Sequence, residues 1–249
     1  ILVVAAAYVH WFWGDGDLTY LVDDIWSSIN RNVLLAIPMF ILAGNIMTRG
    51  SIAERLIAII RALTQWLPGG LAVATILSCA VFAAISGSSP VTLLAVGSIL
   101  YPALLKEGYS KKFSLGALAS GGTLGVVIPP SIPMILYAIA TDKSISDLFL
   151  AGIIPGLMLA GVLSVYALIA NRKIQSEPFN FVQTVQAFRY GIFALMTPVI
   201  LLGGIYSGFF SATEAAAIAV GYSLFVEVFI HREIHITEFF SIAVDTARL

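Results

Sequence analysis

The stretch GGTLGVVIPPSIP at residues 121–133 decides the fold, because it interrupts a helix in the middle of an apolar segment. Residues 113–141 carry no charged side chain, which puts the stretch at membrane depth. Its three prolines donate no N–H group to the carbonyls four residues earlier, and Pro129 pushes Ile128 out of helical geometry. Each carbonyl left unpaired in hydrocarbon costs several kcal/mol. One proline would indicate a kink repaired by a nearby hydroxyl, whereas three prolines preceded by glycines favour a discontinuous helix over residues 113–140.

The composition as a whole predicts a membrane protein. Of the 249 residues, 59% are hydrophobic and 11% are charged, whereas soluble globular proteins are about a quarter charged. A helical span needs about 20 apolar residues, and the windows without charge at 62–105, 113–141, 148–171 and 190–213 supply several. The sequence therefore predicts an all-α, polytopic integral membrane protein. The composition excludes a cytosolic enzyme, a disordered tail and a nucleic-acid-binding protein, and the single cysteine, Cys79, excludes a disulfide scaffold.

The basic residues predict how the spans are oriented. The expected segments are 1–14, 33–48, 71–105, 113–140, 148–170, 190–208 and 212–230. Eleven of the thirteen Lys and Arg residues fall on the inner side, and the loops with Arg31 and with Asp142 and Lys143 fall on the outer side, if segment 71–105 enters and leaves the membrane on the same face. Because the sequence opens on Ile1 within an apolar run too short to span, we expect that the start of the first helix is missing.

Residues 86–90, SGSSP, form a polar turn within the longest window without charge. The turn leaves legs of 15 and 16 residues at 71–85 and 90–105, each roughly 23 Å long and shorter than the hydrocarbon layer of about 30 Å. Two short, tilted spans are one interpretation, and a re-entrant hairpin with a polar tip inside the membrane is favoured. The carbonyls that end the first leg suit a cation, and the N–H groups that open the second leg suit an anion.

Two other segments have helix-start patterns. Residues 51–66 are amphipathic, with Ser51 and Glu54 in a capping-box pattern. This helix either lies in the inner membrane interface as an arm or packs on the protein's own cytoplasmic side. Ser211 and Glu214 form a second capping-box pattern, so a structural role is favoured for Glu214.

The tip and the broken helix offer carbonyl and hydroxyl oxygens without a neighbouring Asp, Glu or His, which indicates a hard monovalent cation such as Na⁺ rather than a proton or a transition metal. An intramembrane serine hydrolase with Ser86 or Ser88 as nucleophile is a distant alternative. It would need a base within about 3 Å, and the sequence offers no His, Lys or Asp at matching depth.

Residues 190–249 echo residues 1–32 in the opposite orientation, which is typical of the inverted repeats of secondary transporters. The expected organisation is a scaffold with an arm helix at 1–66, a transport region at 67–147, a span with a cytoplasmic linker at 148–188 and the incomplete start of a second repeat at 189–249.

Several motifs resemble one known family. They are PMFILAGN at 38–45, GSIAER at 50–55, SGSSP at 86–90, residues 125–133, LAGIIPG at 150–156 and TEAAA at 213–217. In this order along the chain they resemble the large membrane subunit, the DctM-like permease, of tripartite ATP-independent periplasmic (TRAP) transporters. The resemblance covers essentially the whole chain, but the family's second hairpin and second broken helix have no counterpart in it.

The resemblance implies an elevator-type, multi-pass importer in a bacterial inner membrane. It would carry a small organic anion, such as a C4-dicarboxylate or a sugar acid like sialic acid, with Na⁺ as the coupling ion and no cofactor. Its partners would be a small membrane subunit, a periplasmic solute-binding protein and the lipid bilayer, and no nucleic acid. A related Na⁺/dicarboxylate carrier that works without a binding protein is the alternative.

The resemblance also implies two sets of site residues. The residues expected to bind Na⁺ are Ser86, Gly87, Ser89, Gly125, Val126, Ile128, Pro129 and Pro130. The residues expected to bind the substrate are Ser88, Ser89, Pro90, Thr123 and Ser131.

Overall fold

A computed structural model describes residues 2–14, 19–174, 176, 178–235 and 237–248. These residues form helices and connecting turns without a β-strand. Within the described part, six helical segments are long and apolar enough to cross a membrane: Asn32–Arg49, Ser89–Lys106, Lys111–Thr141, Ile145–Ala170, Phe181–Tyr206 and Ala212–His231. The prediction of an all-α, polytopic membrane protein is therefore confirmed.

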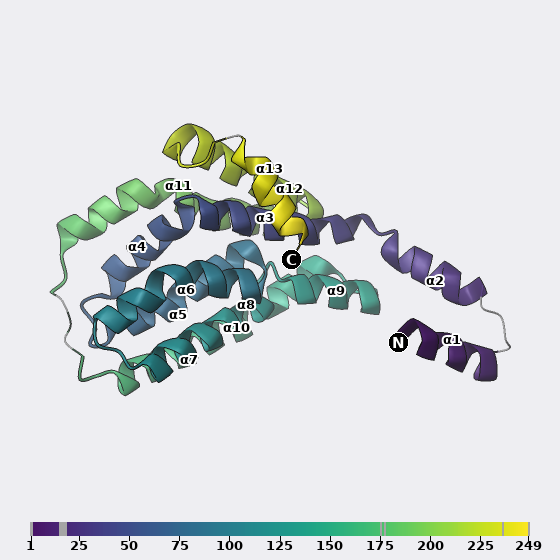
Figure 1. Cartoon of the computed structure of the whole chain (residues 1–249), viewed down its shortest axis with the longest axis horizontal. Helices are drawn as coiled ribbons and strands as arrows, with labels where there is room; N and C mark the ends of the chain where they lie inside the picture. Colours follow the sequence, from purple (N-terminus) through teal and green to yellow (C-terminus); the bar gives the residue numbers. More distant parts are fainter. Residues whose placement is uncertain (1, 15–18, 175, 177, 236, 249) are drawn as a thin grey trace.

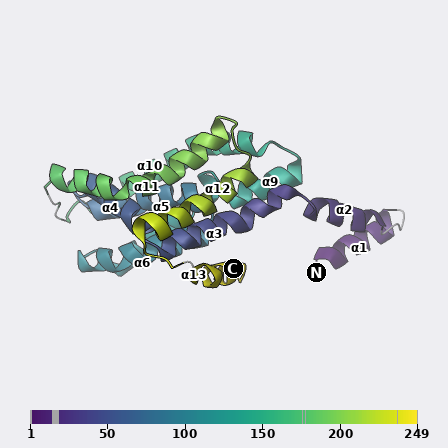
Figure 2. The same cartoon turned by 90° about the horizontal axis from the view of Figure 1, so that it is seen from above.

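The helices form two groups that lie side by side (Figure 1). The first group contains η1 (Asn32–Leu35), α3 (Ala36–Arg49), α4 (Ile52–Thr64), α11 (Phe181–Tyr206), α12 (Ala212–Phe225), its π-helical continuation η2 (Val226–His231) and α13 (Glu238–Ala247). The second contains α5 (Gly70–Ser86), α6 (Ser89–Lys106), α7 (Lys111–Gly122), α8 (Leu124–Val127), α9 (Ile132–Thr141) and α10 (Ile145–Ala170). Two short helices, α1 (Leu2–Trp13) and α2 (Thr19–Ile29), project from one end of the elongated molecule (Figure 2).

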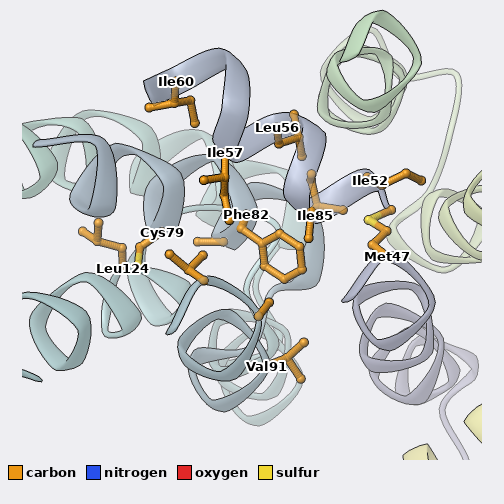
Figure 3. Packing of buried hydrophobic residues seen from close by; sticks show 14 of the residues in the cluster. Met47, Ile52, Leu56, Ile57, Ile60, Cys79, Phe82, Ile85, Val91 and Leu124 are labelled. Atoms are coloured by element: carbon orange, nitrogen blue, oxygen red, sulfur yellow. The ribbon is translucent and has the colours of Figure 1, made fainter. Parts of the chain in front are cut away.

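The apolar core joins the two groups. Helix α5 is buried along almost its whole length because α4, α6, α7 and α10 surround it. Figure 3 shows Phe82 of α5 among Ile57 of α4, Val91 of α6 and other apolar side chains. Because lipid is as apolar as these side chains, close van der Waals packing holds the helices together, and the first leg of the hairpin is the centre of the fold.

Most helix boundaries agree with the sequence to within three residues, but one span was predicted wrongly. Helix α11 begins at Phe181, nine residues before the predicted start at 190. Asn180 caps the helix, since its side chain accepts a hydrogen bond of 3.1 Å from the N–H group of Gln183. The predicted start followed directly after the charged residue Arg189. Arg189 instead lies inside the helix with an exposed side chain.

Helix α4 packs on the protein itself, which is one of the two arrangements that the sequence left open. Its buried residues include Leu56, Ile57 and Ile60, and it contacts both α11 and α5. The predicted capping box of Ser51 and Glu54 is wrong, because the Ser51 side chain does not cap this helix. A carboxylate from the far end of the chain, Glu227, takes its place.

The second capping box is confirmed at the start of α12. The Ser211 hydroxyl accepts a bond of 3.3 Å from the N–H group of Glu214, and the Glu214 carboxylate accepts one of 2.8 Å from the N–H group of Ser211. The Glu214 carboxylate is thus bonded to the start of its own helix, which agrees with a structural role.

Three ion pairs between distant parts of the chain agree with the predicted orientation. Arg31 and Asp142 pair at 2.9 Å between two loops assigned to the outer side. The pairs Arg49–Asp245 at 2.8 Å and Arg61–Glu107 at 2.6 Å join segments assigned to the inner side. Exposed pairs of this kind add little stability, but each one joins residues from the same predicted side of the membrane.

Candidate ion and substrate site

The hairpin turns over two residues. Helix α5 ends at Ser86, Gly87 and Ser88 form the turn, and α6 begins at Ser89. Gly87 has a φ of +61°, and its N–H group donates to the Ala83 carbonyl to close the last turn of α5. Only glycine adopts this left-handed conformation without strain. The polar turn therefore lies within residues 86–90, where the sequence predicts it.

The tip of the hairpin lies directly against the break in the discontinuous helix. The N–H group of Ile132, the first residue of α9, donates a hydrogen bond of 3.0 Å to the Gly87 carbonyl. A Cβ atom at Gly87 would come within 2.6 Å of the Pro130 oxygen, and one at Gly125 within 2.9 Å of the Ser89 nitrogen. Two backbone segments far apart in the sequence thus meet without a side chain between them.

Further glycines let the hairpin lie close to the broken helix. A Cβ atom at Gly121 would lie 2.8 Å from the sulfur of Cys79 in α5, and one at Gly122 would lie 3.2 Å from the Cβ atom of Leu93 in α6. The glycines before the prolines therefore allow both legs of the hairpin to approach the broken helix. Cys79 is buried in this contact. The close approach brings the tip to the break.

The break is made by extended backbone between α8 and α9. Ile128 and Ser131 have ψ angles of 123° and 127°, and the peptide bond between Pro129 and Pro130 is cis. The Ser131 hydroxyl donates a hydrogen bond of 2.6 Å to the Val126 carbonyl. The Val126 carbonyl, which the prolines leave without an N–H partner, is therefore bonded to a nearby hydroxyl, as expected for a simple proline kink. The backbone nevertheless departs from helical geometry at this point.

Four helix ends come together at this point. Helices α5 and α8 end there, and helices α6 and α9 begin there. The C-terminal ends carry partial negative charge and the N-terminal ends partial positive charge. Neither Ser88 nor Ser131, the residues that precede α6 and α9, caps its helix with its side chain. By charge the carbonyl ends suit a cation and the N-terminal ends suit an anion, although Pro90 and Pro133 donate no N–H group and the Ile132 N–H group is already bonded within the chain.

The hydroxyl groups at the tip differ in their bonding. Ser86 and Thr92 are fully buried, and their hydroxyl oxygens lie 2.9 Å apart. The Ser89 hydroxyl is also buried but has no hydrogen-bond partner among the described residues. A buried polar atom without a partner is costly, so the Ser89 oxygen is a buried side-chain group at the tip that is free to bind an ion.

Sequence reasoning missed Thr92, which follows the tip by one helical turn. Its signal in the sequence was a hydroxyl residue one helical turn after the polar tip, in the largely apolar second leg. It holds the Ser86 side chain across the turn, so it stabilises the tip rather than adding a free ligand.

Most of the predicted site residues lie together at the tip and the break, but the side chains of Thr123 and Ile128 point elsewhere. Thr123 lies apart from the tip, because its side chain is exposed and its hydroxyl donates to the Ser120 carbonyl at 2.7 Å. On this helix Gly122 and Gly125 face the hairpin, and Thr123 lies on a side that the tip does not cover. Ile128 contacts Gly156 of α10 with its side chain, so only its backbone is available to the site.

A cavity of about 530 Å³ lies beside the break, lined by side chains such as Ala80 of α5, Pro129 and Leu195 of α11. Its lining is entirely apolar. A cavity without polar groups does not suit a hydrated ion or a carboxylate. We therefore place the candidate site at the tip and the break rather than in this cavity.

Two glycines of α10, Gly152 and Gly156, pack against the break. A Cβ atom at Gly152 would lie 2.8 Å from the Val127 oxygen, and one at Gly156 would lie 2.8 Å from the Ile128 side chain. Gly161, in contrast, has open space around it. Helix α10 thus supports the break from behind.

An all-α chain whose hairpin tip meets the break of a discontinuous helix has the architecture typical of secondary transporters. Comparison with known proteins gives the family. The model of the "Tripartite ATP-independent periplasmic transporter, DctM component" family matches residues 1–249. The chain therefore belongs to this family, and with its apolar helices it is a multi-pass protein of the inner membrane.

Individual relatives agree with the family match. The C4-dicarboxylate TRAP transporter large permease protein DctM of Vibrio cholerae is 45% identical over 204 residues, which cover 80% of this chain and 45% of the relative. The ectoine TRAP transporter large permease protein TeaC of Halomonas elongata is 43% identical over 94% of this chain and 56% of the relative. The 2,3-diketo-L-gulonate TRAP transporter large permease protein YiaN of Escherichia coli is 34% identical over 100% of this chain and 59% of the relative. The chain spans about half the length of these relatives.

Proposed function

We propose that this chain is part of a large permease subunit that carries a small organic anion across the inner membrane together with Na⁺. The observation that carries the proposal is the hydrogen bond between the Gly87 carbonyl and the Ile132 N–H group, which joins the tip to the break. It supports one site in which a cation and an anion bind next to each other. A small membrane subunit and a periplasmic solute-binding protein complete the proposed transporter.

The proposed site binds both ligands with backbone groups and hydroxyls. Na⁺ lies at the carbonyl ends of α5 and α8 with the Ser89 hydroxyl as a further ligand, and the substrate carboxylate lies at the N–H ends of α6 and α9. Residues 62–105 and 113–141 carry no charged side chain, so the two ligands compensate each other's charge. Because this attraction is strong in a low-dielectric site, the anion binds weakly without the cation.

The position of the tip supports a re-entrant hairpin. Helix α9 continues for 10 residues beyond the break, which is roughly 15 Å of helix. The tip lies beside the break and so stops well short of the outer end of α9. A polar tip at this depth is tolerated because it is buried against protein.

An elevator-type movement would slide the second group of helices against the first along the apolar contact between α4 and α5. Helices α5 and α6 contact α7 and α8, and α10 contacts α5, α7 and α8. In the proposed mechanism these helices move as one body, so the site crosses the membrane without coming apart. The scaffold is formed by α3, α4, α11 and α12, in which α3 packs on α12 and α4 on α11.

The site and the relatives both support a small organic acid as the substrate. Backbone N–H groups bind a carboxylate of any small organic acid. The names of the relatives specify C4-dicarboxylates, ectoine and 2,3-diketo-L-gulonate. We propose a C4-dicarboxylate as the first substrate to test.

Uptake of labelled succinate by the complete transporter in liposomes tests the proposed function. We expect uptake that requires the binding protein and follows an inward Na⁺ gradient, with little uptake when choline replaces Na⁺. The related compounds named above serve as further substrates in the same assay. Uptake of any of them that is indifferent to the Na⁺ gradient would contradict Na⁺ coupling.

Two serine substitutions separate ion binding from stability. Ser89→Ala removes a buried hydroxyl without a partner, so we expect the melting temperature of the Na⁺-free protein to stay the same or to rise slightly. Its stabilisation by Na⁺ should be smaller, because the ion loses a ligand. Ser86→Ala removes the bond to Thr92 and should destabilise the protein by about 1 kcal/mol with or without Na⁺. Thermal unfolding of the purified full-length protein over a series of Na⁺ concentrations measures both, and equal Na⁺ stabilisation of Ser89→Ala and the unaltered protein would refute the role of Ser89.

A further inference from the structure

Glu227 is a fully buried carboxylate in the first group of helices. It has an exposed fraction of 0% and lies at the start of the π-helical turns of η2. Sequence reasoning passed over it, although it lies inside the predicted span 212–230. An ionisable residue buried within a span is costly and marks a functional position, and π-helical turns are frequent at such positions.

The partners of Glu227 are at the start of α4. One carboxylate oxygen accepts hydrogen bonds from the N–H groups of Ser51, at 2.8 Å, and Ile52, at 2.6 Å. The other oxygen accepts a bond of 3.4 Å from the Ser51 hydroxyl. The N-terminal end of a helix has unpaired N–H groups and favours negative charge, so Glu227 supplies the cap that the local sequence of α4 does not supply.

The residues around the Glu227 carboxylate hold its hydrogen-bond partner Ser51 in place and leave space for the carboxyl group. The Ser51 hydroxyl also lies 3.0 Å from His231 Nδ1 and accepts a bond of 3.0 Å from Arg55. A Cβ atom at Gly50 would overlap the Glu227 carboxyl group. Gly50 has a φ of −84°, which other residues adopt readily, so a glycine is required there for space and not for backbone conformation.

We propose that Glu227 is a tether that fixes the N-terminal end of α4 to α12. Helix α4 leads from the scaffold into the first leg of the hairpin, through a turn in which Gly69 has a φ of +72°. With its N-terminal end held by Glu227, α4 stays with the scaffold. When helices α5–α10 move, the backbone of residues 65–70 changes conformation. The movement rests on the proposed function, whereas the tether itself does not.

Spin-label distances test the tether without substrate or Na⁺. The labels are placed at two exposed residues, by Glu54→Cys in α4 and Glu233→Cys after η2, in the full-length protein in nanodiscs. We expect one narrow distance distribution in the parent protein and a distribution about twofold broader with Glu227→Gln, because the uncharged amide bonds the helix end less strongly. Glu214→Gln, which changes a carboxylate with a local cap on the same helix, serves as the matched control and should leave the distribution narrow.

Two additional variants distinguish a tether from a simple helix cap. Ser51→Asp combined with Glu227→Gln restores a carboxylate at the start of α4 but no connection to α12, so the distribution should stay broad. A return to the parent width would overturn the proposal, as would an unchanged width with Glu227→Gln alone. Gly50→Ala should broaden the distribution in the parent but add nothing to Glu227→Ala, where the carboxyl group is gone. This second comparison decides the question if Glu227→Gln folds poorly.

Uptake kinetics, normalised to the amount of folded protein in the liposomes, add a second readout that a smaller active fraction does not change. With Glu227→Gln we expect turnover about tenfold lower with an unchanged Na⁺ dependence and KM, because the tip and the break are intact. If no variant transports any substrate, the proposed function fails, but the distance measurements still decide on the tether. An increased KM with unchanged turnover would contradict the tether.

Discussion

Gly125→Ala is expected to lower Na⁺-driven uptake by about 100-fold or more, since displacing groups of a site by about 1 Å has effects of this size. The added Cβ atom would lie 2.9 Å from the Ser89 nitrogen and 3.0 Å from the Ser88 carbonyl carbon. These are backbone atoms that cannot rotate away, so the tip must move off the break. Initial uptake rates in liposomes, normalised to the amount of inserted protein, measure the effect.

Gly116→Ala is the matched control for this substitution. Gly116 lies in α7, in the same broken helix, and a Cβ atom there would have nothing within 4 Å. We expect this variant to keep its uptake rate. If Gly125→Ala retains more than about half of the parent rate while Gly116→Ala is also active, the close contact of tip and break is not needed for transport.

Gly87→Ala is expected to have the second-largest effect, a loss of uptake of similar size with a clear loss of stability. Gly87 has a φ of +61°, which strains an alanine by roughly 1 kcal/mol. In addition, the Cβ atom would lie 2.6 Å from the Pro130 oxygen. The strain and the contact both act at the residue whose carbonyl binds Ile132.

Gly108→Ala separates these two causes. Gly108 has a φ of +85°, but a Cβ atom there would have nothing within 4 Å. This control carries the backbone strain without the contact, so we expect a small loss of stability and nearly normal uptake. Equal losses of uptake in Gly87→Ala and Gly108→Ala would show that strain alone is responsible and would refute the contact with Pro130.

The elements of this fold were predictable because their signals are local. Charge-free windows mark spans, and the prolines near Pro129 break a helix wherever it packs. The turn at Gly87 was visible for the same reason, since a polar turn splits an apolar run into legs of limited length. The local cap of α12 by Ser211 and Glu214 also follows from neighbouring residues alone.

The remaining features depend on contacts between distant residues. Glu54 matched a capping pattern, but Glu227 occupies the end of α4 from 176 positions away from Ser51. Thr123 shares a segment with the site, yet the helical rotation turns its side chain away from the tip. Ser89 and Thr92 are both hydroxyl residues in the first turn of α6, and only the packing shows that the Thr92 hydroxyl is bonded and the Ser89 hydroxyl is free. The assignment of each residue to Na⁺ or to substrate, and the division into domains, stay predictions.

Equilibrium binding of ²²Na⁺ to the purified full-length protein tests most directly whether the tip and the break form one ion site. We expect saturable binding that Gly116→Ala leaves intact and that Gly125→Ala and Gly87→Ala abolish. Binding should be weakened, not lost, in Ser89→Ala, where one ligand is removed and the backbone carbonyls remain. Unchanged Na⁺ binding in Gly125→Ala and Gly87→Ala, or an absence of specific binding in the unaltered protein, would contradict the account.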